Sequence, residues 1–130
     1  MKLQLEKKAL SIGIVVPVTD NDGAKIDINR YRKILIDFIG GYTETNTAGG
    51  WIDKKTDKIY IDNSISFKAS FNSDNIDKPI KALALLIKNL MIDKEKTICF
   101  SINNIDYFID NQPCTIKELM KNIKPLIFER

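Results

Sequence analysis

The sequence predicts an α+β fold in which two helices cover one face of an antiparallel sheet. Three observations support this class. The strand-like segments alternate between apolar and polar residues, which indicates one covered side and one solvent-facing side. Two helix-like segments interrupt these strands in a β-α-β-β-α-β order. A chain of 130 residues, 44% hydrophobic and 28% charged, is also long enough to bury one core.

The first three elements are a strand, a helix and a polar strand. Residues 9–18 are rich in β-branched side chains and precede a turn-forming stretch, so we expect a strand there. Asp27 is a candidate N-cap for a helix over 28–39, which Gly40 would end at positive φ. Residues 42–47 place three threonines on one side and other polar residues on the opposite side, which favours an edge strand or one partly covered by another subunit.

The clearest strand covers residues 58–71. Its odd positions are mostly Ile, Phe and Ala, its even positions are mostly polar, and positions 63–64 are a candidate bulge. Residues 53–58 are typical of a hairpin turn that joins it to a short strand at 51–52. The glycines at 49–50 would turn the chain before that short strand, and the following Trp would cover the end of the core.

The rest of the chain predicts a helix, a hairpin and a last helix. Asp77 or Ser73 is a candidate cap for a helix that carries a buried apolar stripe. A hairpin over 97–109 would turn at the two asparagines 103–104, which tolerate positive φ. The sequence Thr-Ile-Lys-Glu at 115–118 is a capping box for a helix that Pro125 would end.

This element order is the ferredoxin-like arrangement, with an antiparallel sheet and both helices on one of its faces. A strand and a helix over about residues 105–130 extend it at the C-terminal end. We therefore expect a single α+β domain over residues 1–130.

Composition excludes several kinds of chemistry. The chain has no His, which excludes imidazole catalysis and His metal sites. Cys99 and Cys114 match no zinc spacing, and we expect them to be free thiols. The phosphate-loop and dinucleotide-binding glycine motifs are both missing. We expect no catalytic residue, no metal and no cofactor, and an enzyme is the less favoured class.

Charge and hydropathy limit the partners. The net charge is +3 and is spread along the chain, and only three of the 20 basic residues are Arg, which argues against a long nucleic acid. No apolar run is long enough to span a membrane, and the first 20 residues lack a signal-peptide pattern, so we expect a cytoplasmic protein. Richness in Lys, Ile and Asn suggests an AT-rich genome, such as that of a low-GC bacterium or a phage.

The best candidate for a ligand site is the stretch GGYTETNTAGGWID at 40–53. Paired glycines can expose backbone N–H groups to an anion, aromatic rings can stack on a base, and threonines can donate hydroxyls. In the alternative interpretation these residues only cap the helix and turn the chain. The predicted ligand-contacting residues are Gly41, Tyr42, Thr43, Thr45, Gly49, Gly50, Trp51 and Asp62.

The same residues also resemble a pattern found in a known domain family. The pattern GG-x-T at 40–43, followed by Gly49 and Trp51 in G-x-W spacing and by a strand with Asp62, resembles a small bacterial and phage domain family of unknown function. The segment ICFSINNIDYFI is similar to that family's closing hairpin, and the resemblance covers about residues 15–109. It implies a compact ferredoxin-like domain and brings no activity and no site residues.

Three hypotheses for function remain open. The first is a non-catalytic protein, phage-encoded, that captures a nucleotide-like small molecule at a subunit interface, as a counter-defence sponge would. The second is an interaction module or inhibitor that binds a host protein through the edge strand at 42–47 and the apolar tail at 126–128. The third is a small enzyme that uses the carboxylates of Glu44, Asp53 and Asp62. In each case we expect a homo-oligomer.

Overall fold

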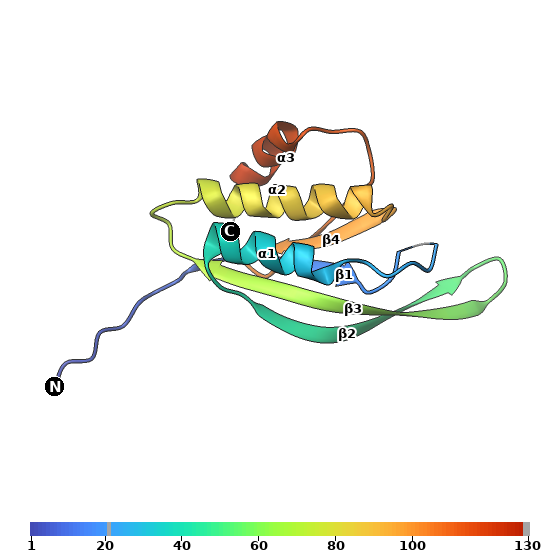
Figure 1. Ribbon diagram of the computed structural model, residues 1–130, viewed down its shortest axis with the longest axis horizontal. Coiled ribbons are helices and arrows are strands. Elements are labelled where there is room, and N and C mark those ends of the chain that lie inside the picture. The colour runs from blue at the N-terminus through green and yellow to red at the C-terminus, as the bar shows by residue number, and fades with distance from the viewer. Residues whose placement is uncertain (21, 129–130) are drawn as a thin grey trace.

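The computed structural model describes residues 1–20 and 22–128 (Figure 1). In chain order, its elements are β1 (Leu10–Pro17), α1 (Ile28–Ile39), β2 (Thr43–Asp53), β3 (Lys58–Phe71), α2 (Asp77–Ile92), β4 (Thr97–Ile102), β5 (Ile105–Asp110), α3 (Ile116–Ile123) and the short 3-10 helix η1 (Lys124–Phe128).

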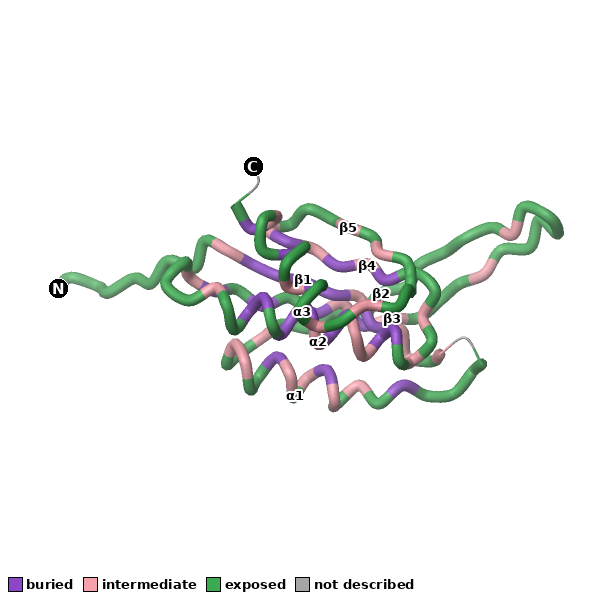
Figure 2. Tube along the Cα trace, turned by 90° about the horizontal axis from the view of Figure 1, so that it is seen from above, coloured by how far each residue is buried: buried purple, intermediate pink, exposed green. Residues whose placement is uncertain are grey.

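The five strands form one sheet in the order β2-β3-β1-β4-β5, and every neighbouring pair is antiparallel. Helices α1 and α2 lie side by side against one face of this sheet, and α3 packs on α2 (Figures 1 and 2). The predicted ferredoxin-like α+β class is confirmed. None of the helices in the described residues lies over the other face of the sheet, and we call it the uncovered face.

The core lies between the sheet and the two long helices. Alternation selects its residues: Ile12, Ile14 and Val16 of β1 are buried, while the residues between them face the other side. The stripe predicted for the second helix is buried throughout, at Ile80, Leu83, Ala84, Ile87, Leu90 and Met91. Figure 2 shows the buried residues concentrated in the middle strands and on the helix faces that meet them.

Three predicted turn and cap signals are confirmed. Gly40 ends α1 at φ 93°, a left-handed conformation that carries no steric cost for glycine. Asn103 and Asn104 form the tight turn between β4 and β5 at φ 53° and 65°. The capping box at the start of α3 is complete, because Thr115 and Glu118 each accept a hydrogen bond from the other's backbone N–H.

Of the two predicted helix caps at aspartates, the position of one is confirmed and the other is wrong. Asp27 occupies the N-cap position of α1, but its side chain accepts no capping hydrogen bond. Ile76 holds the N-cap position of α2 in place of Asp77 or Ser73, and Asp77 is the first helical residue. A carboxylate in the first turn still interacts favourably with the helix dipole, so Asp77 favours the same end of the helix without capping it.

The prediction of a turn at the glycines was wrong. β2 is one continuous strand, in which Gly49 and Gly50 pair with Asp62 and Ile61 of β3. β3 is also continuous, with no bulge at Asn63. The long antiparallel ladder to β3 holds both glycines in an extended conformation, so their freedom to turn is not used.

The far half of this hairpin extends past the body of the protein. β1 ends at Pro17, opposite Ser64 of β3, so residues 48–63 continue as a two-stranded ribbon that we call the arm. Figure 1 shows the arm projecting at one end of the sheet and residues 1–9 leaving at the other. Trp51 lies on the arm and is 53% exposed, so it does not cover the end of the core as predicted.

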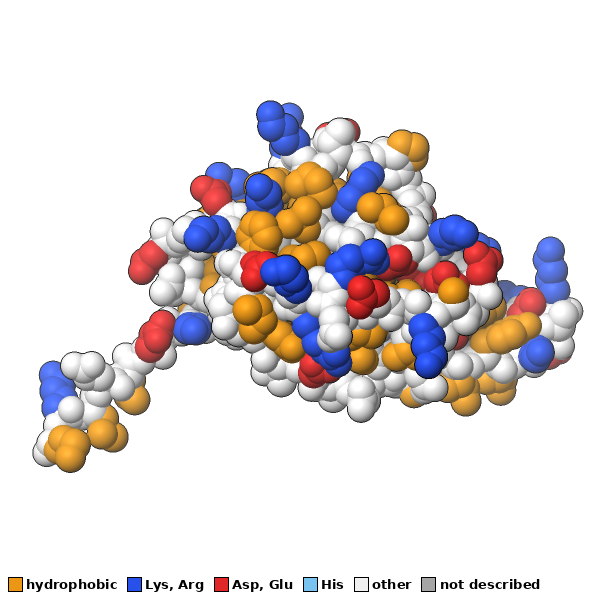
Figure 3. Space-filling view, viewed as in Figure 1, with side chains coloured by type: hydrophobic (Ala, Val, Ile, Leu, Met, Phe, Trp, Pro, Cys, Tyr) orange, Lys and Arg blue, Asp and Glu red, His pale blue; other side chains and the backbone are white. Residues whose placement is uncertain are grey.

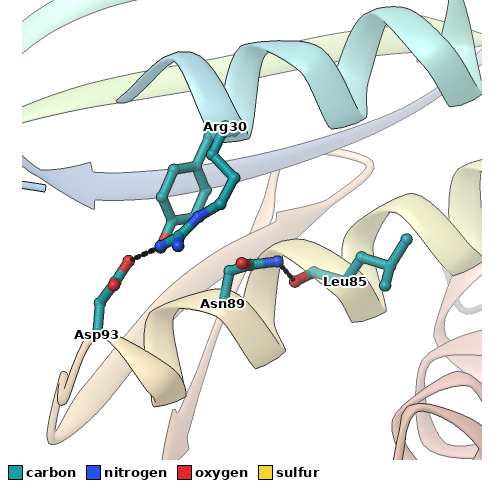
Figure 4. A network of polar contacts seen from close by, with 5 residues as sticks. Arg30, Leu85, Asn89 and Asp93 are labelled. Atoms are coloured by element: carbon teal, nitrogen blue, oxygen red, sulfur yellow. Dashed lines mark hydrogen bonds and ion pairs between the residues drawn. The ribbon is translucent and has the colours of Figure 1, made fainter. Parts of the chain in front are cut away.

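A polar network joins the two long helices (Figure 4). Tyr31 of α1 is fully buried, and its hydroxyl donates to Oδ2 of Asp93 at 2.5 Å. The Arg30 guanidinium donates to the same oxygen at 2.6 Å. Burial, reinforced by the bond to Asp93, raises the pKa of Tyr31 well above its ordinary value. Because Asp93 directly follows α2, this contact fixes the end of that helix against α1.

Candidate ligand-binding hollow

The predicted stretch begins beside a hollow at the C-terminal end of α1. The hollow has a volume of about 650 Å³, within the usual range for small-molecule sites. Three of the predicted ligand-contacting residues, Gly41, Tyr42 and Thr43, line it. The complete lining is Lys8, Ile39, Gly40, Gly41, Tyr42, Thr43, Lys68 and Ser70.

Local structure explains why these side chains meet. The left-handed Gly40 turns the chain out of α1, and Gly41 lies in open space with no atom within 4 Å of the position that a Cβ would take. Tyr42 then packs edge-on against Phe67, with ring centroids 5.6 Å apart. Thr43 pairs with Lys68 of β3 and therefore faces the uncovered side of the sheet.

The charged side chains of the hollow are two lysines, Lys8 and Lys68, and its other polar side chains carry hydroxyls. A nearby carboxylate, Glu44, is held by Arg32, whose Nε and Nη2 donate to its two oxygens at 2.9 and 2.8 Å. Arg32 holds the pKa of Glu44 below its usual range. The described lining of the hollow carries two ammonium groups and no carboxylate, so the hollow suits an anionic group.

The threonines of β2 extend from the hollow along the uncovered face. Thr43, Thr45 and Thr47 pair with Lys68, Ser66 and Ser64 of β3, which confirms that the threonines share one face. Thr45 is therefore the next residue outward on this face, although it does not line the hollow.

The remaining predicted residues lie on the arm, away from the hollow. Gly49, Gly50, Trp51 and Asp62 belong to its two strands. The Trp51 ring stacks on Tyr60 with centroids 4.6 Å apart, and its indole N–H donates to Oδ2 of Asp62 at 3.2 Å. The structure thus divides the predicted site into a group at 41–43 beside Thr45 and a group on the arm.

Sequence reasoning missed Lys8, Lys68 and Ser70. A usable pattern for two of them was present, because Lys68 and Ser70 occupy even positions of β3 and face the same side as Thr43. Lys8 had no such pattern, since it precedes β1 and reaches the hollow only through the path of the chain.

The three carboxylates considered for an enzyme do not form one group. Glu44 pairs with Phe67 and lies on the helix side of the sheet, whereas Asp62 pairs with Gly49 on the uncovered side. Asp53 lies at the far end of the arm, where it pairs with Lys58. A shared carboxylate site is therefore wrong for this arrangement.

A second hollow, of about 240 Å³, lies where β1 ends beside the arm, and we call it the acidic hollow. Asp20, Asp62 and Glu95 line it together with Pro17, Val18, Thr19, Ile61 and Asn63. Partial burial raises the pKa of Glu95, and the charges of Asp62, Asp20 and Asp93 add to this shift. Asp20 Oδ1 accepts the backbone N–H groups of Asp22 and Ala24, as expected of a solvated turn.

Other predicted features concern metals, thiols and membranes. Across residues 1–20 and 22–128, no three acidic or Cys side chains gather as metal ligands would. Cys99 and Cys114 are free thiols. Within the same part of the chain, no helix combines the length and the apolar character that crossing a bilayer requires.

The fold and the hollow define a small antiparallel α+β protein with an open basic depression at the end of its first helix. Among solved structures, it is similar to a phage SAM lyase in complex with S-methyl-5′-thioadenosine, with a TM-score of 0.60 and 12% identity over 85% of this chain and 95% of that one. It is also similar to a phage SAM lyase in the apo state, with a TM-score of 0.58 and 13% identity over 88% and 99% of the two chains. No family profile and no curated protein sequence matches the chain. At these identities the similarity establishes a shared fold.

Proposed function

We propose that this protein binds an anionic nucleoside-bearing small molecule, a nucleotide in the simplest case, in the hollow at the end of α1. The observation that carries the proposal is the pair of lysines, Lys8 and Lys68, in a hollow large enough for such a ligand. The shared fold supports the ligand class, since the solved neighbour holds a nucleoside, S-methyl-5′-thioadenosine.

The lining residues suggest how the ligand is held. The ammonium groups of Lys8 and Lys68 neutralise the phosphate, and the hydroxyls of Thr43 and Ser70 donate to its oxygens or to the ribose. Gly41 leaves the backbone open to close approach by the ligand. Tyr42 is half-buried against Phe67, which fixes its ring at the wall of the hollow and offers an apolar edge to the base.

The biological role in this proposal is sequestration, and the protein acts as a phage-encoded sponge. A hollow that offers hydroxyls and two lysines suits reversible capture of a charged metabolite. The composition typical of an AT-rich genome and the phage source of both solved neighbours support this origin.

Binding is tested by isothermal titration with a panel of adenosine, AMP, S-methyl-5′-thioadenosine and a cyclic dinucleotide. We expect the phosphate-bearing ligands to bind more tightly than the neutral nucleosides, because only they engage both lysines. Affinity for them should fall as salt is raised, since exposed charge pairs are screened. Heat evolution from none of the four ligands at millimolar concentration would remove the proposal.

A second candidate is cleavage of S-adenosylmethionine, favoured by the activity named for the structural neighbours. It is tested by incubating the protein with that compound and following release of S-methyl-5′-thioadenosine by chromatography. Catalytic turnover would make the protein an enzyme and replace sequestration. Stoichiometric binding without product would support the sponge.

A further inference from the structure

Residues 1–7 have the pattern of a strand. The segment leaves the start of β1 and runs away from the body (Figure 1). Leu3 and Leu5 are 73% and 91% exposed, and positions 2, 4 and 6 between and beside them carry Lys, Gln and Glu. This is the alternation of a half-covered strand. Within the part of the chain that the structure describes, no hydrogen bond or ion pair ties residues 1–7 to another segment.

The arm has a matching open edge. β1 ends opposite Ser64, and the N–H of Val18 just beyond it still donates to the backbone oxygen of Asn63 at 3.1 Å. Residues 58–62 of β3 pair with β2 on one side and, within the described part of the chain, have no strand on the other. Ile59 and Ile61 are 66% and 72% exposed on the side of the arm that continues the core face. Ile52 pairs with Ile59 and is 53% exposed. Figure 3 shows hydrophobic side chains exposed both on the arm and on residues 1–7.

A two-stranded ribbon with an exposed apolar side is marginally stable alone, and a third strand is the usual solution. In antiparallel pairing, Leu3 opposite Ile61 brings Leu5 opposite Ile59. These four side chains then cover one another on the apolar side of the arm.

The same register also brings opposite charges together on the polar side of the arm. It places Lys2 opposite Asp62 and Glu6 opposite Lys58, which are two pairs of opposite charge. Parallel pairing with the leucines on the same isoleucines would instead set Lys2 against Lys58 and Glu6 against Asp62, two like-charge pairs. Charge therefore selects the antiparallel orientation. Lys2 in this register also lies next to the acidic hollow, which Asp62 and Glu95 line.

The segment cannot reach the arm of its own chain. Residues 1–9 enter β1 at Leu10, whereas the arm projects beyond Pro17 at the other end of that strand. The eight residues of β1 span about 26 Å at 3.3 Å per residue. Nine residues reach about 30 Å when fully extended, so reversing direction and crossing β1 leaves too few to pair with the arm.

We propose that residues 2–6 of a second copy of this chain add to β3 of the arm as a third, antiparallel strand, with Leu3 opposite Ile61. Two copies that exchange these segments reciprocally form a closed dimer, in which each arm is covered by the other chain. None of residues 2–6 lines the hollow at the end of α1, although Lys8, which does, follows two residues later. The proposal does not depend on the proposed nucleotide binding.

Light scattering of the full chain is the first test. We expect a mass of at least two chains of 14.8 kDa for the natural sequence and of one chain for the double variant Leu3→Asp, Leu5→Asp. Phe108→Asp is the matched control, because Phe108 is 71% exposed on β5 at the opposite edge of the sheet, and it should keep the larger mass. Unchanged circular dichroism of each variant, and unchanged nucleotide binding by the double variant, would separate loss of association from loss of folding.

The register is tested by charge reversal. Glu6→Lys and Lys58→Glu should each weaken association about fivefold by creating a like-charge pair, and the two together should restore it. A disulfide tests the same register directly: with Cys99 and Cys114 replaced by Ser, Leu3→Cys and Ile61→Cys should cross-link two chains under mild oxidation. Leu3→Cys with Phe108→Cys is the control and should not.

Three results would each overturn the proposal. The first is a monomeric mass for the natural chain at every accessible concentration. The second is an unchanged larger mass in the Leu3→Asp, Leu5→Asp variant. The third is equal cross-linking by the Ile61→Cys and Phe108→Cys pairs.

Discussion

The two halves of β3 have one pattern and opposite environments. In the half under the helices, Ile65 is 8% exposed, and in the arm, four residues earlier on the same face, Ile61 is 72% exposed. Alternation is the same in both halves, because it reflects only the pleat of the strand. What differs is what lies above the strand, since α1 and α2 cover the body and none of the described elements covers the arm. A periodic pattern therefore predicts which face is apolar and does not predict what covers it.

The largest expected effect compares these two isoleucines directly. Ile65→Ala should lower the free energy of unfolding by about 3 kcal/mol, because it leaves a cavity in the core. Ile61→Ala should lower it by less than about 1 kcal/mol when measured at concentrations where the chain is monomeric. Urea denaturation of both variants gives the comparison. Equal losses would mean that the arm is packed within its own chain, contrary to its observed exposure.

Two glycines, one in the body and one on the arm, test the same difference in packing. A Cβ on Gly13 of β1 would lie 2.4 Å from Oγ of Ser101 and 3.1 Å from the backbone oxygen of Phe67, so Gly13→Ala should destabilise by about 2 kcal/mol. Adding Ser101→Ala removes the closer contact and should recover part of that loss. Gly49→Ala on the arm meets no atom within 4 Å and should stabilise by about 0.5 kcal/mol. Thermal melts would contradict this account if Gly13→Ala and Gly49→Ala behaved alike.

In the body of the protein, the hydrogen bond from Tyr31 to Asp93 joins α1 to the end of α2. Its removal should give a smaller loss of stability, and this loss should depend on pH. Tyr31→Phe removes one hydrogen bond to Asp93 while Arg30 still donates to that carboxylate, so the expected loss is about 1 kcal/mol near neutral pH. The pKa of Tyr31 is raised above its ordinary value of 10.0, so its contribution is fully present below pH 10 and falls as the pH rises further. The stability difference between natural chain and variant should therefore shrink above pH 10. A stability difference that stayed constant above pH 10 would contradict this role of the Tyr31 hydroxyl.

The smallest expected change in stability is at Glu95, which lies where the body and the arm meet. Burial and the neighbouring carboxylates raise the pKa of Glu95, so its charged form opposes folding at neutral pH. The contribution of Glu95 to the free energy of unfolding is fully present below its ordinary pKa of 4.5. It is lost as the pH rises through the raised pKa of the folded state. Glu95→Gln should stabilise the monomer at pH 7 by less than about 1 kcal/mol, with no gain at pH 4. Destabilisation at pH 7 would show that Glu95 has a cationic partner within its own chain.

Much of the fold could be predicted from sequence because its signals are local. Gly40, Asn103 and the capping box at Thr115 each depend on the conformation or contacts of a few consecutive residues. The continuous β2 could not be predicted in this way. Gly49 and Gly50 are turn formers by local preference, and a ladder to residues 61 and 62 overrides that preference.

The site could be predicted only for those residues that are consecutive in the sequence. Gly41, Tyr42 and Thr43 are consecutive, so the sequence placed them together. Their partners Lys8 and Lys68 come from the start of the chain and from another strand, and only the folded sheet brings them close. The arm residues were grouped with the hollow because they are near in sequence, although a long extended strand separates them.

The central claim, that the hollow at the end of α1 binds an anionic nucleotide, is tested most directly by titrating AMP into three proteins. These are the natural chain, Lys68→Glu and the control Lys54→Glu, which makes the same charge change in the exposed turn of the arm. We expect Lys68→Glu to weaken binding about tenfold, equivalent to about 1.4 kcal/mol, and Lys54→Glu to leave it unchanged. Equal affinity in all three proteins, or no binding by the natural chain, would contradict the account.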